Sequence, residues 1–80
     1  QIGNAFQRAR DLTMVKKDIP LELRRETEEK LTSLEEELKK GEPDAGKVQR
    51  LWNWLKKNAS WAVPIIKDTV VECLKAIFDS

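Results

Sequence analysis

Apolar residues recur at intervals of three or four positions along most of this chain, which is the spacing of one face of an α-helix. Apolar and polar residues do not alternate for more than a few positions, as they would in a half-buried strand. The periodic segments predict helices over residues 3–17, 19–40, 44–58 and 61–79. We therefore expect an all-α protein, built as a small bundle of three to four helices.

Capping residues lie at the boundaries between the predicted helices. Asp18 and Pro20 predict the start of the second helix, because aspartate accepts backbone N–H bonds and proline fits a first helical turn. Gly41 predicts the end of that helix, since glycine readily adopts the left-handed conformation of a C-terminal cap. Asp44 and Ser60 are the predicted N-caps of the third and fourth helices.

The second helix carries a narrow apolar seam that ends in Leu31, Leu34 and Leu38. The spacing is that of a coiled coil, but the seam is shorter than the run of heptads that identifies one. The short connection after Gly41 predicts an antiparallel hairpin with the third helix. An antiparallel hairpin or a bundle accommodates the seam as well as a coiled coil does.

The fourth helix is apolar on most of its circumference. One stripe contains Ala62, Ile66, Val70, Cys73, Leu74 and Ile77, and it is widened by Val63, Val71 and Phe78. A helix this apolar needs cover from the other helices or from another chain. A chain of 80 residues forms one core of marginal stability, and oligomerisation is a common supplement. We therefore expect residues 1–80 to form a single helical domain that self-associates.

The charges nearly cancel, because 15 basic and 14 acidic residues leave a formal net charge of +1. Long-range attraction to a charged partner is therefore weak. Carboxylates gather on the second helix, where lysines follow several of them at the next helical turn. The predicted ion pairs are Glu26 with Lys30, Glu35 with Lys39, and Glu36 with Lys40. This arrangement is typical of a solvated helix face rather than of a catalytic pair of carboxylates.

The chain has no histidine, no tyrosine and one cysteine, Cys73. These absences exclude a His-dependent nucleophile and a metal site built from histidines and cysteines. Cys73 falls on the apolar stripe of the fourth helix and is predicted to be a small buried hydrophobe. No glycine-rich phosphate loop is present. We therefore expect no enzyme activity, no catalytic residues, and no cofactor or metal ligands.

The three tryptophans all lie in the segment 50–61, beside lysines and an arginine. Such a cluster can stack on nucleic-acid bases, but the nearly neutral charge and the position of Trp52 on an apolar stripe argue against this use. Tryptophans and lysines before an apolar helix are also typical of a membrane-surface anchor, whereas the charges inside that helix argue against a span. Trp61 is predicted to cover the start of the last helix. Trp54 lies off the apolar stripe and is the predicted contact with something outside the fold.

A combination of features spans residues 19–78. They are Ile19-Pro20, a leucine-spaced acidic helix, the Gly41-Glu42-Pro43 break, Gly46-Lys47, the Trp54-Leu55-Lys56 element and the apolar last helix. This combination resembles a type of C-terminal tail in bacterial conflict proteins of the AbiTii-type abortive-infection class and in other multidomain bacterial effectors. The resemblance implies a helical module appended to an effector or sensor domain in antiphage defence, used for self-assembly or partner docking. It implies no catalytic residues, and the first predicted helix lies outside it.

These observations favour a non-enzymatic helical module for protein–protein interaction, which forms homo-oligomers of a larger bacterial protein or binds another helical protein. No nucleic-acid partner is expected. The alternative is an amphipathic tail on a membrane surface, anchored by Trp54, Trp61 and Phe78. The predicted interface consists of Leu31, Leu34, Leu38, Trp54, Trp61, Val63, Val71 and Phe78. Because the sequence begins with Gln1 and shows no secretory signal, we expect a C-terminal piece of a longer cytoplasmic protein.

Overall fold

The computed structural model describes residues 2–79, which form four helices. They are α1 (Ile2–Val15), α2 (Leu21–Leu38), α3 (Ala45–Asn58) and α4 (Val63–Asp79). No strand occurs in the described residues, so the prediction of an all-α fold is confirmed. The observed helix ends differ from the predicted ones by no more than two residues.

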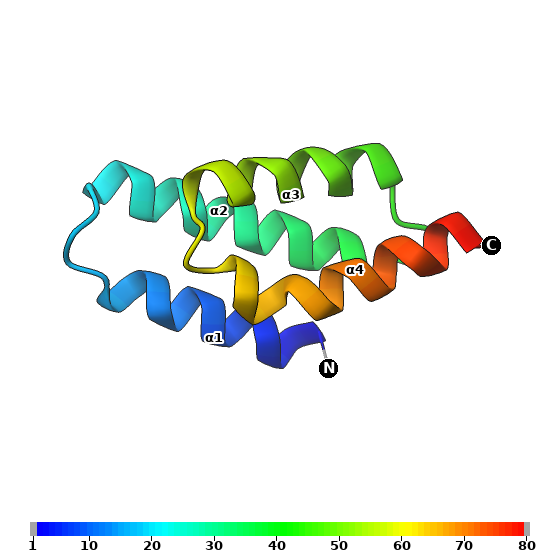
Figure 1. The fold of residues 1–80 in the computed structure, drawn as a ribbon, viewed down its shortest axis with the longest axis horizontal. Helices are drawn as coiled ribbons and strands as arrows, with labels where there is room; N and C mark the ends of the chain where they lie inside the picture. The colour runs from blue at the N-terminus through cyan, green and yellow to red at the C-terminus, as the bar shows by residue number, and fades with distance from the viewer. Residues whose placement is uncertain (1, 80) are drawn as a thin grey trace.

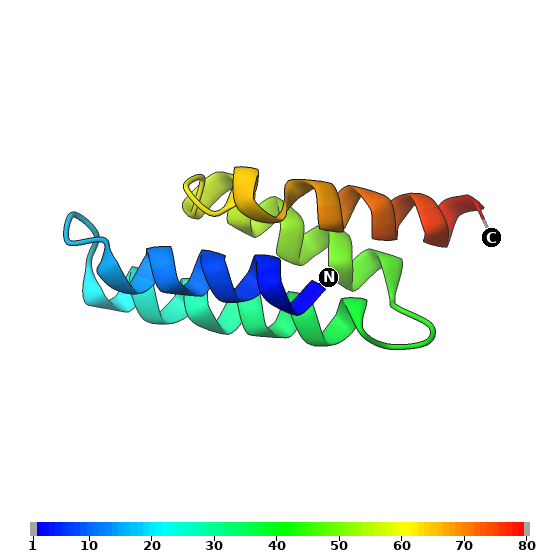
Figure 2. The same ribbon diagram turned by 90° about the horizontal axis from the view of Figure 1, so that it is seen from below.

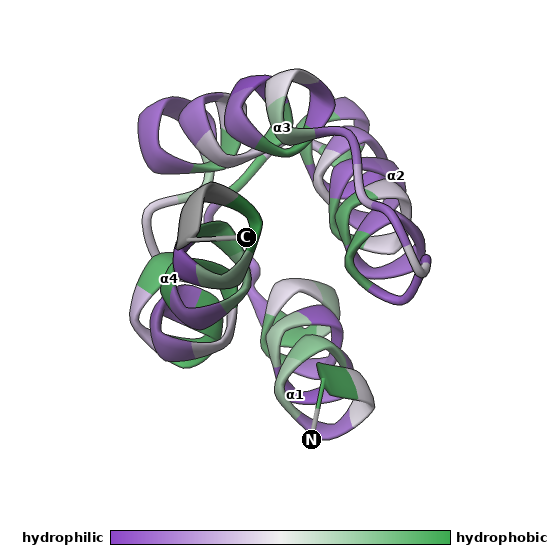
Figure 3. Cartoon of the chain, turned by 90° about the vertical axis from the view of Figure 1, so that its right-hand side faces the viewer, coloured by the Kyte–Doolittle hydropathy of each residue, from purple (hydrophilic) through white to green (hydrophobic). Residues whose placement is uncertain are grey.

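Successive helices run in opposite directions and form an up-and-down bundle (Figure 1 and Figure 2). Seen from one end, the helices lie at the corners of a square, in which α1 and α3 each contact both α2 and α4 (Figure 3). The bundle measures 41 × 22 × 17 Å along its principal axes. α1 begins and α4 ends at one end of the bundle, and the connection between α1 and α2 projects from the opposite end (Figure 1).

The apolar sides of the helices meet in one core along the bundle axis, while the outer sides are mainly polar (Figure 3). The buried apolar residues are Ala5, Phe6, Ala9, Leu31, Leu34, Leu38, Val48, Trp52, Leu55, Ala59, Ala62, Ile66 and Val70. Full burial of one large apolar side chain stabilises a fold by roughly 1.5 to 3 kcal/mol. Because every helix contributes residues to this core, the helices cover one another's apolar stripes within one chain.

α4 obtains its cover from α1 and α3. Ile66 and Val70 are completely buried, and Val63 and Leu74 pack against the core while partly exposed. The cover that the sequence predicts for this helix is thus supplied largely by the same chain. Cys73 is only partly buried, contrary to the prediction, because it faces an open groove beside the connection of α2 and α3.

The predicted N-caps of α3 and α4 have different outcomes. Asp44 caps α3 as predicted, because its Oδ1 accepts hydrogen bonds from two N–H groups of the first turn at 2.9 and 3.2 Å. Ser60 lies in the turn before α4, which begins only at Val63, and its carbonyl oxygen accepts a hydrogen bond from the Val63 N–H at 3.3 Å. The later start places Pro64 in the first turn of α4, where its missing N–H removes no helical hydrogen bond.

The predicted caps of α2 at Asp18 and Gly41 are wrong. Pro20 is itself the N-cap, since its ring holds φ at −60° and its ψ of 149° is extended. Asp18 instead pairs with Lys16, with 3.6 Å between Nζ and Oδ1. At the other end Lys39 is the C-cap in a right-handed conformation, and no described residue has a positive φ. The chain therefore leaves α2 without the left-handed turn that glycine favours.

Candidate interaction surface

Trp61 joins the turn before α4 to the end of α1. Its indole Nε1 donates a hydrogen bond to Thr13 Oγ1 at 3.0 Å, and that hydroxyl donates to the carbonyl oxygen of Ala9 at 2.8 Å. The ammonium of Lys16 lies 5.1 Å from the centre of the indole ring. Trp61 therefore fastens two elements of the fold together and is not a free surface anchor.

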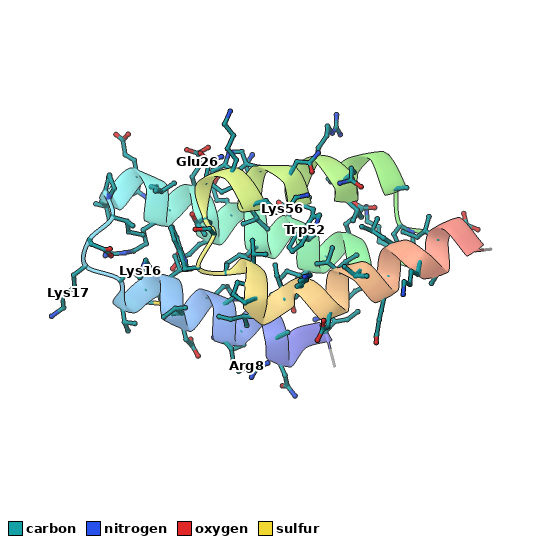
Figure 4. The ribbon with its side chains drawn as sticks, viewed as in Figure 1. Arg8, Lys16, Lys17, Glu26, Trp52 and Lys56 are labelled. Carbon is teal, nitrogen blue, oxygen red and sulfur yellow. The ribbon has the colours of Figure 1, made fainter. Side chains whose placement is uncertain are left out.

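The other two tryptophans are also paired with lysines of the same chain. Trp52 is 6% exposed, and the ammonium of Lys56 lies 5.9 Å from its ring centre (Figure 4). Trp54 is half-buried, and Lys30 of α2 lies 5.5 Å from its ring centre. Cation–π contacts contribute about 0.5 to 1 kcal/mol at exposed sites. The lysines nearest the tryptophans therefore contact indole rings of the same chain. Trp54 nevertheless remains partly exposed on the outside of α3.

The predicted leucine seam of α2 lies in the core. Leu31 and Leu34 are completely buried and Leu38 is 5% exposed, because α1 and α3 flank α2 on both sides. These side chains fill the interior of their own chain. In this fold, the surface that a second copy could contact lies elsewhere.

The other predicted interface residues lie on α3, on α4 and in the turn between them. Trp54, Trp61, Val63 and Val71 are each partly exposed. The side chain of Phe78 lies outside the described part of the structure. The structure does not gather the predicted residues on one face, because the seam points inward while the tryptophans contact different neighbouring helices.

Glu35 joins α2 to α1 through ion pairs. Its carboxylate lies 2.5 Å from Arg10 Nη1 and 2.7 Å from Lys39 Nζ, and the second contact confirms a predicted pair. Burial raises the pKa of Glu35, but hydrogen bonds from Lys39 and Arg10, together with their charges, leave that pKa below its ordinary value of 4.5. The pairing of Glu35 with Arg10 could not be predicted from sequence spacing, because Arg10 lies on another helix.

Glu37 joins α2 to the start of α3. Its carboxylate accepts a hydrogen bond from the Asp44 N–H at 2.9 Å and lies 3.1 Å from Lys40 Nζ and 3.5 Å from Lys47 Nζ. The bond from Asp44, followed by the bond from Lys40, lowers the pKa of Glu37. The second half of α2 is therefore held by buried carboxylates on both of its flanks.

Two predicted ion pairs of α2 do not form. Lys30 lies over an indole ring of α3 instead of pairing with Glu26. Lys40 bonds to Glu37 instead of Glu36. In both cases the lysine turns toward the side of α2 that faces α3, where its partner is less exposed than the predicted one. Glu26 and Glu36 are left without an ion pair in the described part of the chain.

The outer sides of α2 and α3 carry exposed charges of opposite sign. The exposed carboxylates of α2 that have no ion pair or hydrogen bond among residues 2–79 are Glu22, Glu26, Glu29 and Glu36. The exposed cations of α3 that share a side with Trp54 at helical spacing are Lys47, Arg50 and Lys57, of which Lys47 also pairs with Glu37. Together with Trp54, these residues are called the α2/α3 face. Arg25, also exposed on α2, offsets part of the negative charge.

A shallow groove runs between α2 and α3. It is lined by Lys30, Lys47, Arg50, Leu51 and Trp54. Its charged lining groups are all cationic, and they surround the apolar surface of Leu51 and Trp54. The groove therefore combines a small apolar floor with positive charge and lies directly beside the acidic side of α2.

A second exposed cluster lies where α1 connects to α2. Leu12, Met14, Val15 and Leu21 are 37%, 62%, 68% and 63% exposed, and they are called the apolar tip. Arg24 donates a hydrogen bond to the carbonyl oxygen of Lys16 and so closes this connection, while Lys17 extends away from the bundle (Figure 4). The exposure of the apolar tip could have been predicted from the sequence, because Met14, Val15 and Leu21 lie off the apolar stripes of their helices.

Residues 2–79 contain no group of three or more side chains suited to hold a metal ion. Burial, followed by the charge of Glu72, raises the pKa of the Cys73 thiol. None of the described helices is both long enough and apolar enough to cross a bilayer. No protein-family model matches the chain, and neither the curated proteins nor the solved structures contain a significant match.

Proposed function

We propose that this chain is a non-enzymatic helical interaction module that associates with copies of itself, as the assembly domain of a larger bacterial effector or sensor. The observation that carries the proposal is the α2/α3 face, where exposed carboxylates without an ion pair among the described residues lie beside exposed cations of the adjacent helix. A surface with both signs of charge side by side is complementary to a second copy of itself. Because the core is filled within the chain, association uses this outer surface and leaves the bundle intact.

The resemblance of residues 19–78 to AbiTii-type tails supports the kind of parent protein. It supports the proposal that the parent is a cytoplasmic protein of antiphage defence. The features that carry the resemblance include the acidic helix and the Trp54-Leu55-Lys56 element, which supply residues to both sides of the α2/α3 face.

Light scattering tests self-association directly. We expect a mass above the 9.3 kDa of one chain, rising with protein concentration. The series should cover a roughly hundredfold range of concentration, since association follows mass action. Added salt should lower the mass, because a higher ionic strength shortens the screening length and weakens the attraction between exposed charges of opposite sign. A constant mass of 9.3 kDa throughout would contradict the proposal.

Attachment to an anionic membrane surface is the second candidate, and the apolar tip favours it. Its exposed side chains lie among Lys16, Lys17, Arg24 and Arg25, which is the combination of apolar area and positive charge that binds anionic lipid. In this form of the hypothesis the tip replaces the tryptophans as the anchor. Cosedimentation with vesicles containing phosphatidylserine, but not with neutral vesicles, would support it. Val15→Ser with Leu21→Ser should abolish that binding and leave the light-scattering mass unchanged.

A further inference from the structure

We infer that the α2/α3 face forms a two-fold symmetric contact in which α2 of each copy lies against α3 of the other copy. This inference rests on the proposed self-association and adds the surface and the symmetry of the dimer. It follows from the level of each charged residue along the bundle and from the few ways in which a two-fold axis can bring this face against itself.

Contacts inside one chain set the relative levels of α2 and α3. Lys30 lies 5.5 Å from the ring centre of Trp54, and Glu37 lies 3.5 Å from Lys47. The two helices are antiparallel and side by side (Figure 1). The part of α2 before Lys30 therefore lies beside the part of α3 after Trp54, since both helices rise about 1.5 Å per residue.

Carboxylates of α2 and lysines of α3 therefore lie at similar positions along the bundle axis. Counted from the level that Lys30 shares with Trp54, Glu26 and Glu29 lie near the level of Lys57, toward the end of the bundle where α2 begins and α3 ends. Glu36 lies near the level of Lys47, at the other end. Negative and positive side chains therefore occur at matching heights toward both ends of the face, whereas the charged groups that line the groove at its middle are all cationic.

A two-fold axis parallel to the helices, placed over the groove, sets α2 of one copy on α3 of the other without changing the level of any residue. Glu26 and Glu29 then lie opposite Lys57 of the second copy, and Glu36 lies opposite Lys47. An axis across the helices would instead place α2 on α2 and α3 on α3. Like charges would then face one another, which destabilises a complex, so the charge pattern selects the parallel axis.

The middle of the face supplies an apolar contact. Leu51 and Trp54 are partly exposed in the groove, and two copies related by the parallel axis cover each other's grooves. Arg50 lines the same groove and forms no ion pair with any described residue. Tryptophan and arginine are typical central anchors of protein interfaces. The dimer thus combines a small apolar centre with charged pairs around it.

Charge reversal tests the arrangement. One variant carries Glu26→Lys and Glu29→Lys on α2, and the other carries Arg50→Glu and Lys57→Glu on α3. In a homodimer of either variant, α2 of each copy faces α3 residues of the same charge on the other copy. We therefore expect its dimer to be at least about tenfold weaker than that of the wild type. An equimolar mixture of the two should form a heterodimer. A chain with all these substitutions should again form a homodimer.

Matched variants on α4 control for net charge. Asp68→Lys with Glu72→Lys changes the net charge as the α2 variant does, and Lys67→Glu with Lys75→Glu changes it as the α3 variant does. All of these α4 residues are exposed, and none belongs to the α2/α3 face. We expect both controls to dimerise as the wild type does. Circular dichroism of every variant checks that the helical content is unchanged.

Sedimentation equilibrium distinguishes failure of this inference from failure of the proposed function. A wild-type chain that stays monomeric overturns self-association itself. A wild-type dimer that survives both face variants leaves self-association standing and overturns this surface. A mixture that fails to form the heterodimer, or a wild-type assembly that grows beyond two chains, overturns the parallel two-fold arrangement.

Discussion

Two buried threonines differ in whether the side-chain hydroxyl has a hydrogen-bond partner. Thr13 and Thr27 are both completely buried. The Thr13 hydroxyl donates to a carbonyl oxygen of α1 and accepts the bond from Trp61, so it is satisfied twice. The Thr27 hydroxyl has no hydrogen-bond partner among the described residues. Both residues fall on helical stripes in the sequence, but only Thr13 lies beside a donor from another element, the indole N–H of Trp61.

Thr27→Val is expected to raise the free energy of unfolding by about 1 kcal/mol, because it removes a buried hydroxyl that has no partner and keeps a similar shape. Thr13→Val is the matched substitution. It leaves the indole N–H of Trp61 without an acceptor, so we expect a loss of about 1 to 3 kcal/mol. Urea unfolding followed by circular dichroism measures both changes. Effects of equal size and sign would contradict the different roles.

At the scale of the element, α2 is fastened to both of its neighbours by carboxylates in its second half. Glu35 contacts Arg10 of α1, and Glu37 accepts a hydrogen bond at the start of α3. The pKa of each carboxyl group is lower in the folded chain than its ordinary value. Each group therefore contributes stability above its unfolded pKa, and that contribution is lost as the pH falls through its folded pKa.

The melting temperature is accordingly expected to fall as the solution is acidified from about pH 5 to about pH 3. Glu35→Gln should lower the melting temperature at neutral pH and reduce its dependence on acid. Glu28→Gln is the control on the same helix, since Glu28 forms no ion pair with the described residues and lies outside the α2/α3 face. Thermal unfolding at a series of pH values makes the comparison. The same acid dependence in wild type and Glu35→Gln would refute the role of this carboxylate.

At the scale of the whole molecule, α1 closes the bundle. Its residues Phe6 and Ala9 are completely buried between α2 and α4. Without α1, the apolar stripes of α2 and α4 would lack cover on one side. The folded unit therefore includes α1.

Phe6→Ala is expected to cost about 3 to 5 kcal/mol, because it removes a large buried ring and leaves a cavity. That is a large fraction of the roughly 5 to 15 kcal/mol by which small domains are stable. Leu12→Ala, on the same helix at a position that is 37% exposed, should cost much less. Chemical denaturation of both variants measures the difference. A small loss for Phe6→Ala would mean that α1 is dispensable for the core.

The sequence by itself determined the helical segments, the inward residues such as Ile66 and Trp52, and the cap at Asp44. These features depend on periodicity and on contacts within a few residues, which a helix carries along its own axis. Only the tertiary structure decided that Lys30 turns to Trp54, that Trp61 bonds to Thr13, and that carboxylates of α2 remain unpaired beside the cations of α3. Periodicity states which way a side chain points from its own helix, but the helix that lies there depends on how the whole chain packs.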